Sequence, residues 1–297
     1  MEKIGLVLSG GFAKGAYQVG ILKAVRDLID CDNIKIISGG SVGALNAYAF
    51  ANGRLDELEE VWKSLEYKSM TSFIREKLQG TFLDNTINSI TAESRPMDLD
   101  LYFALLNLTK KELEYINTTP LEKELQKKYA RATVAFPAFN MPVKINDDYY
   151  LDGALVDNIP IYPLVGEDVD AIICMYFEDY NFNFENDEIN EKTIRINCQS
   201  EMFLKNAIIF KHEYIVKMID DGYAYGKKII EKFFENGVLI DDYKEKIREF
   251  NKDNENVKWY ITCDIVATKV NKVLSKIFKT KERKNNIEKE TCEDNIQ

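Results

Sequence analysis

The first fifty residues repeat one pattern twice: a short apolar run ends at glycines, and apolar side chains then recur at helical spacing. Ile4 to Leu8 form the first run, and Ile34 to Ile37 form the second. A continuous apolar run of this length is typical of a strand buried on both faces of a parallel sheet. Two such strand–helix units in succession predict a mostly parallel sheet with helices on both faces. The first helix is indicated by apolar residues at helical spacing, namely Ala16, Val19, Leu22, Val25 and Ile29. The second is indicated by Ala44 to Ala51, which are rich in helix-forming residues.

The rest of the chain carries less regular patterns. Val143 to Ile145 and Tyr149 to Leu151 flank three turn-forming residues and predict a hairpin. Thr71 to Asp98 predicts only a helical or loop insertion. The other expected elements are a helix at Leu55 to Leu65, a strand at Leu99 to Leu108, a helix at Leu121 to Tyr129, a strand at Ala171 to Tyr176, a long or broken helical stretch at Gln199 to Phe234 and a strand at Trp259 to Ile265.

Composition narrows the classes of function. The net charge of −10 argues against a nucleic-acid surface, which needs clustered Lys and Arg. The five cysteines lie far apart without C-x-x-C spacing, so neither a disulfide framework nor a zinc site is indicated, and we expect no metal or cofactor. We find no signal-peptide pattern and no apolar stretch of membrane-spanning length, which favours a cytoplasmic protein. The sequence does not indicate an oligomeric state.

The segment "GGSVG", Gly39 to Gly43, matches the G-x-S-x-G nucleophile elbow of serine hydrolases. It lies between a predicted strand and a predicted helix, which is the context that the elbow requires. Gly39 and Gly43 leave room for the tight turn around Ser41, and the helix that follows adds its positive end to a developing oxyanion. An incidental serine in a loop is the alternative, and the combination of pattern and context favours the elbow.

The earlier glycine-rich turn, Gly10 to Gly15, fits an anion but not a nucleotide phosphate. A P-loop would place Lys and Ser or Thr after the last glycine, whereas Ala16 follows here. The dinucleotide fingerprint fails because Phe12 stands at its second glycine. An oxyanion hole made by the backbone N–H groups around Gly10, Gly11 and Phe12 fits better, although a plain strand–helix turn is the simpler alternative.

A serine nucleophile needs a base, and the chain has a single histidine. His212 falls inside a predicted helix, whereas a triad histidine usually lies on a loop, so a structural role is favoured for it. Asp152 follows the predicted hairpin and precedes Gly153, where a turn could direct its carboxylate into a cleft. A turn-forming aspartate is the alternative.

Four segments of the chain resemble, in order, the successive blocks of the patatin-like phospholipase family: "LSGGFAKGAYQVGIL", "GGSVG", "FPAFNMPV" and "LDGALVDNIPIYPL". They extend from Ile4 to Leu164, a little over half of the chain. The resemblance implies a three-layer α/β/α fold with a mostly parallel central sheet and hydrolysis of fatty acyl esters in lipids. It also implies a Ser-Asp dyad without histidine, with these assignments: Ser41 as nucleophile, Asp152 as base, Gly10, Gly11 and Phe12 as the oxyanion hole, and Lys14 and Gly15 as supporting loop residues.

Two positions depart from the family pattern. Phe12 stands where the family commonly has a third consecutive glycine, and Ala154 makes the dyad block Asp-Gly-Ala instead of Asp-Gly-Gly. A positive φ at Phe12 would cost about 1 to 3 kcal/mol of backbone strain. Neither change removes a reacting group. We therefore expect a phospholipase A-type lipid acyl hydrolase, with two alternatives: a catalytically silent lipid-binding or regulatory protein, and a soluble carboxylesterase or thioesterase that uses the same dyad.

The C-terminal segment is basic and amphipathic. We expect the hydrolase domain to cover residues 1–268, and residues 269–297 to form a helix and a charged tail. From Lys269 to Lys284, lysines and an arginine alternate with an apolar face, a pattern typical of a helix at an anionic lipid surface. A helix that closes the protein's own core shows the same pattern. The apolar face consists of Val270, Val273, Leu274, Ile277 and Phe278.

Overall fold

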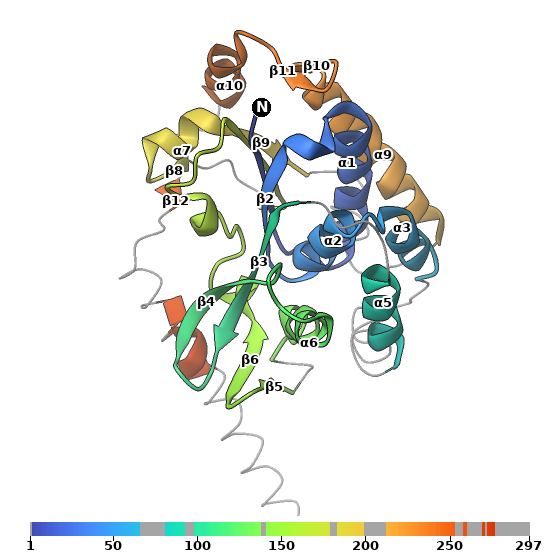
Figure 1. Cartoon of the computed structure of the whole chain (residues 1–297), viewed down its shortest axis with the longest axis vertical. Helices are drawn as coiled ribbons and strands as arrows, with labels where there is room; N and C mark the ends of the chain where they lie inside the picture. The colour runs from blue at the N-terminus through green and yellow to red at the C-terminus, as the bar shows by residue number, and fades with distance from the viewer. Residues whose placement is uncertain are drawn as a thin grey trace, which may run out of the picture.

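The computed structural model describes residues 2–65, 81–92, 98–137, 141–178, 183–198, 212–252, 258–259, 269–270 and 272–276. Its centre is a mixed sheet with the strand order β5-β6-β3-β2-β1-β7-β9, and β4 pairs with β3 (Figure 1). Strands β3, β2, β1, β7 and β9 are parallel to one another, whereas β4, β5 and β6 pair in antiparallel fashion. The strands are β1 Ile4–Leu8, β2 Ile34–Gly39, β3 Asp100–Asn107, β4 Glu112–Asn117, β5 Val143–Ile145, β6 Asp148–Asp152, β7 Ala171–Tyr176 and β9 Thr193–Asn197.

Helices cover both faces of this sheet (Figure 1). On one face, Leu6 and Leu8 of β1 pack in a core with α1, α2 and α9. On the other face, Val7 packs with the segment after β6 and with α7. The α/β fold with a mostly parallel sheet is therefore as the sequence predicts. The helices are α1 Gly15–Leu28, α2 Val42–Ala51, α3 Leu55–Lys63, α5 Thr81–Thr91, α6 Lys123–Thr133, α7 Asp187–Lys192, α9 His212–Ile230 and α10 Tyr243–Asn251.

Most predicted elements are confirmed, including the hairpin, which β5 and β6 form around Asn146 at a φ of 54°. The prediction of a helical stretch up to Phe234 is wrong at its end, because α9 ends at Ile230 and Phe234 begins a small hairpin. The parts at 199–211 and 260–265 lie outside the described residues. The insertion contains α5, and its segments 71–80 and 93–97 also lie outside. The short strands are β8 Asn183–Phe184, β10 Phe234–Glu235, β11 Val238–Leu239 and β12 Lys258–Trp259.

The described part of the C-terminal segment packs on the protein itself. Residues 269–270 and 272–276 are helical, and Val270 and Leu274 are buried in a cluster with Leu106, Leu151 and Val156. This contact favours the core-closing alternative for that stretch, while the lysines at 272 and 276 are exposed. The rest of the predicted apolar face lies outside the described residues, and the division at residue 268 stays a prediction. Among the residues that the structure describes, no helix is long and apolar enough to cross a membrane.

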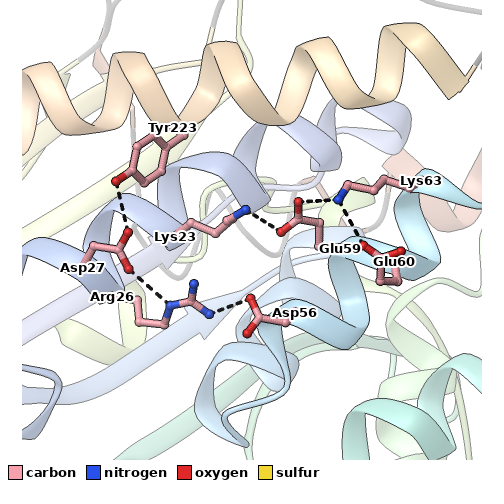
Figure 2. A network of polar contacts seen from close by, with 8 residues as sticks. All are labelled: Lys23, Arg26, Asp27, Asp56, Glu59, Glu60, Lys63 and Tyr223. Carbon is pink, nitrogen blue, oxygen red and sulfur yellow. Dashed lines mark hydrogen bonds and ion pairs between the residues drawn. The ribbon is translucent and has the colours of Figure 1, made fainter.

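Two separate groups of polar side chains tie α1 to its neighbouring helices (Figure 2). In the first, Asp27 of α1 accepts a hydrogen bond from the Tyr223 hydroxyl of α9 at 3.1 Å. Glu59 of α3 lies at the centre of the second, with carboxylate oxygens 2.6 Å from Lys23 Nζ and 2.8 Å from Lys63 Nζ. Burial acts to raise the pKa of Glu59, but the hydrogen bonds and charges of the two lysines outweigh it, and the pKa is lowered. A carboxyl with a lowered pKa stabilises the fold above its ordinary pKa, and this contribution is lost as the pH falls.

We expect Glu59→Gln to lower the free energy of unfolding at pH 7 by about 1 to 3 kcal/mol, because two lysines then lose a buried carboxylate as partner. Glu60→Gln is the matched control. Its carboxylate also pairs with Lys63, but the side chain is 74% exposed, and an exposed ion pair contributes little. Urea unfolding of both variants measures the difference. Equal stabilities of the two variants would contradict the central role of Glu59.

Candidate active site

Ser41 lies at a strained turn between β2 and α2. Its φ of 54° and ψ of −132° are unusual for a residue with a side chain. The neighbouring glycines permit this turn. A Cβ on Gly43 would lie 2.5 Å from the Leu8 carbonyl oxygen, and one on Gly39 would lie 2.6 Å from the Ala44 Cα. The local geometry therefore matches a nucleophile elbow, in which glycine is required on both sides of the serine.

The glycine-rich loop runs directly beside this turn. It follows β1, and the parallel register that pairs Leu8 with Gly39 brings the carboxyl ends of β1 and β2 to the same edge of the sheet. A Cβ on Gly10 would lie only 2.7 Å from the Ser41 Cβ. The two sequence motifs thus form one site, at the end of the strands where α/β proteins usually bind ligands.

Asn158 fixes the first glycine of the loop. The Gly10 N–H donates to Asn158 Oδ1 at 3.0 Å, and Asn158 Nδ2 donates back to the Gly10 carbonyl at 3.1 Å. The Gly10 N–H is therefore engaged with a side chain. Among the described residues, no acceptor is found for the N–H groups of Gly11 and Phe12. Of the three predicted oxyanion donors, these two are the ones open to an anion.

Phe12 adopts a φ of 50°, the strained value that its place in the glycine loop implies. Its ring packs edge-on against Phe136, with centroids 5.7 Å apart. Gly11 passes under the Phe177 ring, where a Cβ would lie 2.3 Å from a ring carbon. Lys14 Nζ lies 3.5 Å from the Phe177 carbonyl oxygen, so Lys14 contacts the segment that follows β7. These contacts hold the loop against the end of β7.

Asp152 ends β6 and is 2% exposed. Burial raises the pKa of its carboxyl to about 7, although the nearby Ser41 side chain and the Ala154 N–H act in the opposite direction. The Ala154 N–H donates to Asp152 Oδ1 at 2.9 Å. A Cβ on Gly10 would lie close to both Ser41 and Ala154, so the turn after Asp152 and the serine elbow meet at the same glycine. The fold thus places a buried carboxyl that can accept a proton near neutral pH close to a serine at an elbow.

His212 lies elsewhere. It begins α9, its side chain is exposed, and its Nδ1 lies 2.7 Å from the Lys63 carbonyl oxygen at the end of α3. This contact ties two surface helices together. The sequence contains no second histidine.

An apolar cavity of about 50 Å³ lies between α2, α3 and α5. Its wall includes Val42, which directly follows Ser41, together with Leu45 and Trp62. Within the described ranges, no group of three His, Cys, Asp or Glu side chains is placed to hold a metal ion.

Sequence reasoning missed Asn158, although it lies within the block that contains Asp152. A polar residue two positions before Pro160 suggests only a turn. Its partner Gly10 is 148 residues away, so only the folded chain shows the contact.

Comparison with known proteins finds relatives in sequence and in structure, of which three are described here. A protein of Acanthamoeba polyphaga mimivirus, itself uncharacterised, is 25% identical over 289 residues, which cover 89% of this chain and 92% of the viral protein. Lysophospholipase nte1 of Aspergillus terreus is 26% identical over 195 residues, which cover 59% of this chain but 12% of the fungal protein. Among solved structures, VipD from Legionella pneumophila has a TM-score of 0.44 at 14% identity and covers 78% of this chain and 67% of that chain.

The family model for patatin-like phospholipases matches residues 6–165, more than half of the chain. The match begins in β1, before the glycine loop, and ends after Asp152. It therefore includes Ser41, its elbow and the aspartate that lies near it. The chain belongs to the patatin-like phospholipase family, whose members are serine lipid acyl hydrolases.

Proposed function

We propose that the protein is a phospholipase A-type lipid acyl hydrolase that uses Ser41 as nucleophile and Asp152 as general base. The position of Ser41 at a strained elbow, beside the glycine loop and near the buried Asp152 carboxyl, carries the proposal. The family match and the name of the fungal lysophospholipase support an acyl ester of a lipid as the substrate.

The mechanism follows from this arrangement. Asp152 takes the proton of the Ser41 hydroxyl as Oγ attacks the ester carbonyl carbon. The N–H groups of Gly11 and Phe12, with the positive end of α2, stabilise the negative oxygen of the tetrahedral intermediate. The intermediate collapses, the ester C–O bond breaks, and Asp152 returns the proton to the leaving alcohol. Asp152 then takes a proton from a water molecule as its oxygen attacks the carbonyl carbon of the acyl-serine. The bond between this carbon and Oγ breaks, Asp152 returns the proton to Ser41 Oγ, and the fatty acid is released.

Two measurements test the proposal. The purified chain is first assayed with a chromogenic ester before and after treatment with a serine-directed fluorophosphonate. We expect turnover that the reagent abolishes, with one label at Ser41. An absence of both turnover and label would contradict the hydrolase and favour the silent lipid-binding alternative.

A panel of phospholipid, lysophospholipid and soluble esters then separates the lipid hydrolase from a soluble esterase or thioesterase. We expect higher kcat/KM for the lipid esters, and a rate gain when the substrate passes from monomers to an interface. Equal rates on monomeric and interfacial substrate would favour the soluble esterase.

A further inference from the structure

Two amide side chains are buried between α1 and α2, inside the apolar core. Gln18 belongs to α1 and Asn46 to α2, and both are 0% exposed. A buried amide is costly unless its hydrogen bonds are made. Asn46 Nδ2 donates to the Gly15 carbonyl at 3.0 Å and to Gln18 Oε1 at 2.9 Å, and Asn46 Oδ1 accepts from Trp62 Nε1 at 3.2 Å.

The two amides hold both ends of the glycine loop. Gln18 Nε2 donates to the Ser9 carbonyl at 3.2 Å, and Ser9 is the residue immediately before the loop. Gly15, which Asn46 holds, is the residue at which the loop enters α1. Asn46 lies on the helix that begins at the elbow, about one and a half turns after Ser41. The pair therefore forms a short bridge between the loop and the helix that Ser41 caps.

We propose that Gln18 and Asn46 are positioning residues, which fix the glycine loop relative to Ser41 so that the N–H groups of Gly11 and Phe12 stay directed at the oxyanion. The inference rests on the proposed function. The loop is held at Gly10 by Asn158 from the opposite side, so the amide bridge completes its restraint. Oxyanion donors act through their exact placement before the reaction, and small displacements lower the rate steeply.

A purely structural role would have a different signature. Losing the bridge would then lower the stability of the fold, while each folded molecule would keep its normal turnover. Tyr48 provides the matched control, because it is a buried residue of the same helix α2 whose hydroxyl donates to Gln126 Oε1 at 2.9 Å and bonds to neither loop end. Tyr48→Phe removes one hydrogen bond of α2 and leaves both loop anchors in place.

The test compares Gln18→Met, Asn46→Leu and Tyr48→Phe with the wild type, using the full chain and a chromogenic ester. The concentration of competent enzyme is titrated with a fluorophosphonate at its reaction end point, so that kcat refers to folded sites. We expect kcat to fall by about tenfold or more for Gln18→Met and Asn46→Leu with KM within about twofold, since loss of one oxyanion donor typically costs about a hundredfold. Tyr48→Phe should keep a kcat near that of the wild type.

The outcomes separate the inference from the function on which it rests. Unchanged kcat per titrated site in both amide variants, with an active wild type, would overturn the positioning role alone. An equal loss in Tyr48→Phe would also overturn it, because the effect would then follow the loss of any hydrogen bond of α2 and not the loss of the loop anchors. If Asn46→Leu does not fold, Gln18→Met decides. A wild type without turnover or label would contradict the proposed function and this inference with it.

Discussion

Ser41→Ala and Asp152→Asn are each expected to lower the rate of ester hydrolysis by about a hundredfold or more, because a positioned general base alone contributes about that much. Ser41→Ala removes the attacking oxygen. Asp152→Asn keeps the size of the side chain and an oxygen for the Ala154 N–H, but the amide cannot take the serine proton. Both rates are measured with a chromogenic ester after circular dichroism shows that each variant is folded.

Two controls accompany these variants. His212→Ala is expected to keep a rate near that of the wild type, because His212 contacts the end of α3 and is exposed. Asp148→Asn makes the same chemical change as Asp152→Asn at the other end of β6, where the carboxylate accepts from Asn107. An inactive His212→Ala beside an active Asp152→Asn would replace the dyad with a histidine-based mechanism.

The part of the fold that surrounds the site could be predicted because local sequence encodes it. β1 and β2 are short apolar runs with glycine at or just after their ends, so the burial pattern and the freedom of the backbone point to the same turn. Gly43 shows the reason most clearly, since a Cβ there would collide with the carbonyl oxygen of Leu8. The positive φ of Phe12 could be anticipated only from its place in the family's glycine loop.

The sequence analysis does not predict β4 and β9. β4 pairs with the adjacent strand β3 in a hairpin, but its half-buried positions include Glu114 and Asn117, so the contrast between its two faces is weak. β9 contains Arg195, a residue that argues against a buried strand, yet it is 3% exposed and donates to Asn190 Oδ1 at 2.7 Å. In both strands the polar residues find their partners only in the folded chain.

The candidate site likewise contains residues that the sequence identifies and residues that only the structure identifies. Ser41 and Asp152 belong to sequence motifs, so their types and contexts could be recognised. The residues that hold the loop, namely Asn158, Gln18 and Asn46, carry ordinary side chains whose roles arise only from what they contact. For the C-terminal segment, the periodicity predicts an apolar helix face. It does not predict which partner covers that face.

The rate of hydrolysis should depend on pH through Asp152. Only the ionised carboxylate can act as base, and its pKa is raised to about 7 by burial. We expect kcat/KM to rise about tenfold per pH unit below this value and to level off above it, so that the rate at pH 5 is about a hundredfold below the plateau. The measurement needs an ester whose leaving group does not titrate between pH 5 and 9. A midpoint near 4 would show that Asp152 is not the group that limits the reaction.

Stability should change with pH in the opposite direction. The pKa of Asp152 is higher in the folded protein, about 7, than its ordinary value of 3.8 in an unfolded chain. Between these values the folded state binds a proton that the unfolded state has released, so the contribution is full below pH 3.8 and is lost as the pH rises through 7. At about 1.4 kcal/mol per pH unit, Asp152→Asn should gain about 2 to 3 kcal/mol relative to the wild type between pH 5 and pH 8. Urea unfolding of both proteins at the two pH values measures this gain, and a constant difference would contradict it. The ionised form that hydrolysis requires is thus the form that the fold disfavours, because one buried carboxylate sets both.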